Sequence, residues 1–123
     1  MRGLLWLGVV FEVGVAFHLL DHLRRGLPPF VATTAVPFLI VGPLALFGIW
    51  RGHRWGAALM ALVAAAGLTF GVWEHLISCS PDHLAAIPWP SALLTVATLG
   101  VTVPLGWGSL RVVLPRLDRD RAP

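Results

Sequence analysis

The sequence predicts an all-α integral membrane protein, a four-helix transmembrane bundle built from two tandem, parallel-oriented helical hairpins. Composition sets the class, because 57% of the 123 residues are hydrophobic, 12% are charged and the mean hydropathy is +0.80. Soluble globular domains are far less apolar. Four apolar runs approach the roughly 20 helical residues that cross a hydrocarbon core of about 30 Å. A polar signature also occurs twice within this apolar sequence, which indicates an internal repeat.

The apolar runs define the expected spans. They cover residues 3–20, 30–50, 55–73 and 87–110. Helices are expected because spanning strands would show alternating segments of about 10 residues, and no such alternation is present in the sequence. Short loops make successive helices antiparallel neighbours. The organisation that follows is one membrane domain at 1–113, with repeat one at 3–52 and repeat two at 55–113, and a charged cytoplasmic tail at 114–123.

The arginines indicate the orientation in the membrane. Two of the nine, Arg24 and Arg25, follow the first span, and the other seven fall on the opposite side. By the positive-inside bias, both termini are cytoplasmic, in a prokaryotic-type cytoplasmic membrane. The arginines act as topology signals beside apolar runs and form no basic stripe, so we expect a lipid bilayer as the environment and no nucleic-acid partner.

The repeated signature is the strongest functional signal. Its two copies are His18-x2-Asp21-His22 and His75-x6-Asp82-His83. Further matches at a constant offset pair Pro29 with Pro90, Thr34 with Thr95 and Pro43-Leu44 with Pro104-Leu105. The second copy carries four extra residues, 78–81, about one helical turn. A tandem duplication with a pseudo-twofold axis along the membrane normal explains these matches.

Parallel first and third spans bring both copies to the outer face of the membrane. Imidazoles bind zinc, copper, nickel and iron, and carboxylates complete or orient such sites. The expected ligands of a transition-metal ion of unknown identity are therefore His18, His22, His75, His83 and Glu74. The residues expected to orient imidazoles or to relay protons are Glu12, Asp21 and Asp82.

Glu12 lies about 9 Å deeper in the membrane than His18, at 1.5 Å rise per residue. A carboxylate at this depth is costly, so it should face the bundle interior and be neutral or paired. A structural alternative is a protonated Glu12 that donates a hydrogen bond to the hydroxyl of Thr33, Thr69 or Thr102.

Other functions remain open at this stage. His18 and His75 could ligate one haem b from two helices, which would make the chain an electron-transfer membrane subunit. The same side chains could form a proton or quinone relay. A noncatalytic accessory subunit is a further alternative, in a homo-oligomer or a larger membrane complex, because Gly- and Ala-rich faces suit close helix packing. Nucleophilic catalysis has little support, and enzymatic activity stays undecided.

The two copies of the signature resemble length variants of the His-x(n)-Asp-His motif of nickel and cobalt permeases, where it contributes to metal selection. The resemblance covers only His18, Asp21 and His22 in the first copy and their counterparts in the second. It implies transition-metal binding and transfers no specific ion. Binding, sensing or passage of a metal ion is therefore the function that the sequence favours.

Overall fold

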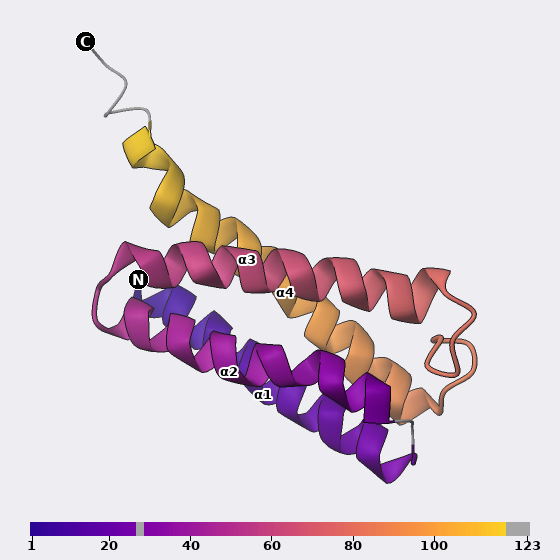
Figure 1. Ribbon diagram of the computed structural model, residues 1–123. Helices are drawn as coiled ribbons and strands as arrows, with labels where there is room; N and C mark the ends of the chain where they lie inside the picture. The colour runs from indigo at the N-terminus through magenta and orange to yellow at the C-terminus, as the bar shows by residue number, and fades with distance from the viewer. Residues whose placement is uncertain (27–28, 118–123) are drawn as a thin grey trace.

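The computed structural model describes the backbone of residues 1–26 and 29–117 and the side chains of 1–26 and 36–114. The elements follow in the order α1 (Arg2–Arg24), α2 (Pro29–Trp50), α3 (Arg54–Val72), the short π-helix η1 (Trp73–Ile77) and α4 (Trp89–Leu117). Figure 1 shows the helices side by side along the bundle, with the N-terminus and the end of α4 at the same end. The predicted all-α bundle of four helices is confirmed.

Three helical segments within the described residues are long and apolar enough to cross a membrane. They are Arg2–Arg24, Arg54–Ile77 and Trp89–Leu114. The apolar part of α2 whose side chains the structure describes, Val36–Trp50, is shorter. A membrane crossing by α2 therefore remains a prediction, as does the tandem repeat.

Each helix packs against two others, α1 and α3 both lying against α2 and α4. The core between them is apolar and contains small residues where backbones approach closely. At the α2–α3 contact, a Cβ atom added to Gly56 would lie 2.6 Å from the carbonyl carbon of Gly48 and 2.7 Å from the carbonyl oxygen of Ala45. Glycine is therefore required at Gly56, as in close pairs of membrane helices.

The outer surface of the bundle carries large apolar side chains along its length. Trp6, Phe17, Leu62 and Trp89 are among those that are more than half exposed. Soluble monomers rarely expose contiguous apolar surface on this scale. The surface is suited to contact with lipid.

The ends of two helices depend on glycine. The first helix ends where Gly26 adopts φ 67° and donates its N–H to the carbonyl of Leu23 at 3.1 Å. The α2–α3 turn uses Gly52, with φ 77°, in the same way. These left-handed residues stop a helix within one turn. The first helix therefore ends at Arg24, four residues beyond the apolar run that ends at residue 20. Asp21 and His22 lie on this additional helical turn.

Candidate metal centre

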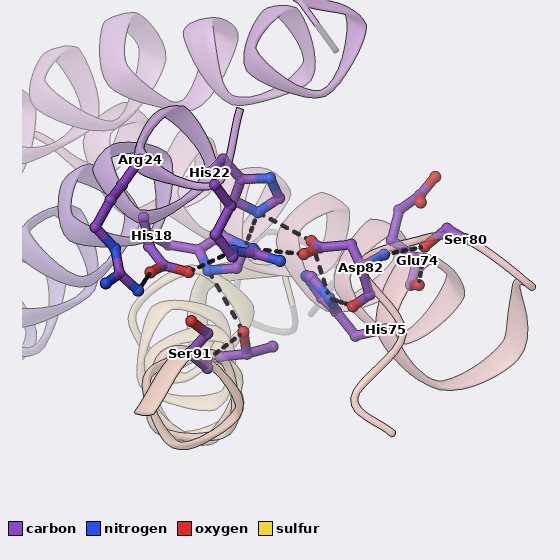
Figure 2. Close-up of polar contacts among 11 residues, drawn as sticks. His18, His22, Arg24, Glu74, His75, Ser80, Asp82 and Ser91 are labelled. Atoms are coloured by element: carbon purple, nitrogen blue, oxygen red, sulfur yellow. Dashed lines mark hydrogen bonds and ion pairs between the residues drawn. The ribbon is translucent and has the colours of Figure 1, made fainter. Parts of the chain in front are cut away.

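Four side chains from three segments meet at one end of the bundle (Figure 2). They are His18 and His22 of α1, His75 of η1 and Asp82 of the segment between η1 and α4. One ligand atom from each lies within 4.8 Å of the others. His22, His75 and Asp82 are buried, and His18 is half-buried. We call these four residues the histidine–aspartate cluster.

The helical spacing of four residues stacks His22 over His18 on one face of α1. Their Nε2 atoms are 2.8 Å apart, and their rings meet edge to face at 4.3 Å. On the other side of His18, Nδ1 lies 3.4 Å from the hydroxyl oxygen of Thr95 in α4. Because this hydroxyl donates its only proton to the carbonyl of Ser91, it accepts from His18 Nδ1–H. The lone pair of His18 Nε2 then points into the cluster.

The π-helix η1 presents His75 to the same point. Ser78 donates its N–H to the carbonyl of Trp73 five residues earlier, at 2.7 Å. Such π-turns change the side-chain register of a helix and are frequent at functional sites. His75 Nδ1 donates to the carbonyl oxygen of Asp82 at 2.8 Å, since a carbonyl only accepts. In the neutral imidazole this leaves Nε2 of His75 unprotonated, as a metal ligand must be, while Nδ1 also lies 3.2 Å from Asp82 Oδ2.

The insertion that distinguishes the second copy of the signature folds Asp82 back over His75. The hydroxyls of Ser78 and Ser80 both donate to the carbonyl of Glu74, at 3.0 and 2.9 Å. Asp82 N–H then donates to the hydroxyl of Ser80 at 3.2 Å. Leu84 N–H closes the segment on the carbonyl of His75 at 2.9 Å. These bonds place the Asp82 carboxylate beside the imidazoles.

Asp82 carries the negative charge of the cluster. Its Oδ2 lies 2.9 Å from His22 Nε2, and its Oδ1 accepts from Arg25 Nη2 at 2.5 Å. Burial alone raises the pKa of Asp82, but hydrogen bonds from His22 and Arg25 outweigh burial and lower the pKa to about 2. Arg25 is itself held by Asp21, whose Oδ2 lies 2.9 Å from Arg25 Nε. The carboxylate is thus ionised and fixed in direction.

The donor set fits a transition-metal ion after small movements. In a tetrahedral site with bonds of 2.0–2.1 Å to the metal, ligand atoms lie about 3.3 Å apart. The contacts of His22 Nε2 to His18 Nε2 and to Asp82 Oδ2, at 2.8 and 2.9 Å, are shorter than this. An ion would replace these hydrogen bonds and separate these two pairs of atoms by about half an ångström, while ligand atoms up to 4.8 Å apart would move closer together. Nδ1 of His22, which has no partner among the described atoms, would then carry the ring proton.

A cavity of about 120 Å³ extends from the cluster into the bundle. His18, His22 and His75 form its polar end together with Asp82. The rest of the wall is mainly apolar and comes from all four helices. The apolar side chains that line it are Phe11, Val15, Leu19, Phe38, Phe70 and Leu99.

The other residues that the sequence singled out lie outside the cluster. Glu74 lines the cavity without joining the group of ligand atoms. His83 turns to its own segment, where Nδ1 accepts from Ala85 N–H at 3.2 Å. Asp21 contacts Arg24 and Arg25 through ion pairs rather than an imidazole.

Glu12 faces the bundle interior, against Gly42 of α2. Both carboxyl oxygens are buried and have no hydrogen-bond partner among the described residues. The alternative hydrogen bond from Glu12 to Thr69 or Thr102 is therefore not formed. The side chain of Thr33 lies outside the described residues.

Two parts of this site were not predicted from the sequence. Arg25 was assigned only a role in topology, although its position four residues after Asp21 is the spacing of a helical ion pair. Thr95 was matched within the repeat but given no role, and it contacts His18. The link from Arg25 to Asp82 has no local sequence signal, because 57 residues separate the two.

Comparisons with protein-family models, with curated proteins and with solved structures returned no match. The function is therefore inferred from the geometry of the histidine–aspartate cluster.

Proposed function

We propose that this chain is a membrane protein that binds one transition-metal ion at His18, His22, His75 and Asp82. The observation that carries the proposal is the convergence of four such ligand atoms within 4.8 Å inside the bundle. Three imidazoles with one carboxylate suit zinc, copper, nickel, cobalt or iron better than magnesium or calcium, which prefer oxygen ligands. The ion is bound, sensed or passed on.

The surrounding contacts support metal binding. Thr95 and the carbonyl of Asp82 each hold the Nδ1 atom of an imidazole, of His18 and His75 respectively. Partners of this kind fix the tautomer and ring orientation of ligating histidines. Arg25 binds only the Oδ1 oxygen of Asp82, so Oδ2 stays directed at the imidazoles.

Two alternatives are less well supported by the same geometry. A porphyrin is at least as large as a drug-sized ligand, and pockets that bind such ligands have volumes of about 300–1,000 Å³. The cavity beside the cluster holds only about 120 Å³. An accessory subunit that used these side chains for partner contacts would expose them, whereas His22, His75 and Asp82 are each at most 5% exposed.

A titration of the purified protein with Zn²⁺ or Co²⁺ tests the proposal. We expect one ion per chain near neutral pH, and weaker binding at acid pH, because a protonated imidazole cannot ligate. Asp82 does not contribute to this loss, since its pKa of about 2 keeps it ionised throughout. Its interactions with His22 and Arg25 stabilise the fold above its ordinary pKa of 3.8, and that stabilisation is lost only as the pH falls toward 2. Absence of binding at neutral pH, or equal affinity at pH 5 and pH 7.5, would contradict the proposal.

We further propose that both termini are cytoplasmic, that α2 completes a four-span domain and that the cluster lies toward the outer face. The distribution of arginines supports this orientation. A membrane-impermeant maleimide should therefore label the exposed Cys79 in intact cells, and Cys79→Ser should remove the signal. Labelling that appears only after the membrane is disrupted would reverse the orientation.

The internal repeat is also a proposal. His18 and His75 occupy matched sequence positions, and their ring centroids lie 5.1 Å apart, which supports a pseudo-twofold relation. The second histidines of the two copies differ, since His22 joins the cluster and His83 does not. If a duplication occurred, the insertion at 78–81 accounts for this asymmetry.

A further inference from the structure

We propose that the cavity below the cluster is a binding site for one small, uncharged, apolar molecule, in the size range from a diatomic gas to benzene. This site extends from the metal ligands into the interior of the bundle. It lies between α1, α3 and α4, with Phe38 contributed by α2. Its occupancy does not require the metal, although contact between the bound molecule and an ion rests on the proposed function.

Size is the first argument. The cavity volume of about 120 Å³ is close to that of an engineered cavity of about 150 Å³ in another protein, which stays dry and binds benzene or xenon. Molecules with a few heavy atoms fit wholly within such a volume, whereas cofactors and lipid chains would extend beyond its open side.

The chemistry of the wall is the second argument. Three threonines line the cavity, and each donates its hydroxyl proton to a carbonyl of α4: Thr95 to Ser91, Thr98 to Leu94 and Thr102 to Thr98. They therefore offer no donor to the cavity. A water molecule needs two to four polar partners to be held in place. Away from the imidazoles and the carboxylates of Glu74 and Asp82, the wall favours an apolar occupant.

Access is the third argument. Phe70 forms part of the cavity wall and is also 56% exposed on the outside of the bundle. The cavity is partly open, and Phe70 lies both on its wall and on the apolar surface that is suited to lipid. Uncharged apolar molecules concentrate in the hydrocarbon core of a membrane, so they would enter from the bilayer and reach His18 and His22, which line the same cavity.

Xenon is a suitable probe because it is apolar, uncharged and small. Protein labelled at the methyl groups of valine and leucine is titrated with xenon in detergent micelles, with a chelator present so that no metal is bound. We expect saturable shifts at Val15 and Leu99, which line the cavity. Leu93, which is 61% exposed on α4, should show only a shift linear in xenon pressure.

A matched pair of variants separates the cavity from nonspecific partitioning. Gly67 lines the cavity, and a Cβ atom there meets Phe11 at an ordinary 3.4 Å, so Gly67→Val should fit and fill the space. Gly100 has no atom within 4 Å of an added Cβ, so Gly100→Val is the control. The saturable shifts should vanish in the first variant and persist in the second.

A second filling variant, Val15→Phe, tests the same space from α1 and is followed at Leu99. Shifts that remain linear at Val15 and Leu99 in the unmodified protein would overturn the proposal. Saturable shifts that survive both filling variants would do so as well. Because the chelator excludes metal, neither result bears on whether the cluster binds an ion, and the metal titration decides that separately.

Discussion

Replacement of His75 by alanine is expected to remove metal binding, with affinity lowered by at least about 100-fold. Loss of a residue that merely supports a ligand typically costs 10–100-fold, and loss of the ligand itself should cost more. His75→Ala also leaves the carbonyl of Asp82 without the donor that His75 Nδ1 supplies. His18→Ala should have the same effect on binding. The measurement is competition of each purified variant with a chelator of known affinity, together with elemental analysis.

Two other histidines provide matched controls. His53 is exposed in the α2–α3 turn, at the opposite end of α3 from His75. His53→Ala should therefore bind metal as the unmodified protein does. His83 was expected from the sequence to be a ligand, but it lies outside the group of four. The cluster therefore predicts full binding in His83→Ala. Unchanged stoichiometry and affinity in His75→Ala would contradict the proposed ligand set.

Substitution of Gly42 by alanine is expected to destabilise the bundle by about 1 kcal/mol, at the lower end of typical overpacking effects, because the atoms in the way are the end of a flexible side chain. A Cβ atom at this position would overlap the Glu12 carboxyl group, whose oxygens are buried. The fold must then separate α1 from α2 or move Glu12. The measurement is the free energy of unfolding in mixed micelles. Gly100→Ala is the control, because its new methyl group meets nothing within 4 Å, and it should be neutral or slightly stabilising.

The double variant Glu12→Ala with Gly42→Ala isolates this contact. Removal of the carboxyl group makes room for the new methyl group, so the loss of stability seen in Gly42→Ala should be largely recovered. Glu12→Ala alone should cost little, since the carboxyl group has no hydrogen-bond partner among the described residues. Simple addition of the two single effects would show that Gly42 and Glu12 do not interact.

The helices could be predicted from sequence because each apolar run is a local signal of fixed length. The limits of α1 were less predictable: the helix ends at Arg24 with Gly26 as its stop, while the apolar run ends four residues earlier. That difference matters for the site. It places His22 one helical turn above His18 and brings Arg25 within reach of Asp82.

The repeated histidines pointed to the location of the site but not to its composition. Asp82 was predicted to orient imidazoles, and the structure places its carboxylate among the four ligand atoms. The π-turn at His75 and the hydrogen bonds of Ser78 and Ser80 determine that position. These bonds depend on how one segment folds onto a neighbouring helix end, which no periodicity in the sequence records.

The most direct test of the metal site is the X-ray absorption spectrum of the purified protein loaded with one equivalent of Zn²⁺. The account predicts three imidazole nitrogens and one carboxylate oxygen at about 2.0–2.1 Å from the metal, without sulfur. The imidazole scattering should decrease in His75→Ala. A shell that contains sulfur from Cys79, or one made of oxygen atoms with no imidazole scattering, would contradict the assignment of the histidine–aspartate cluster as the metal centre.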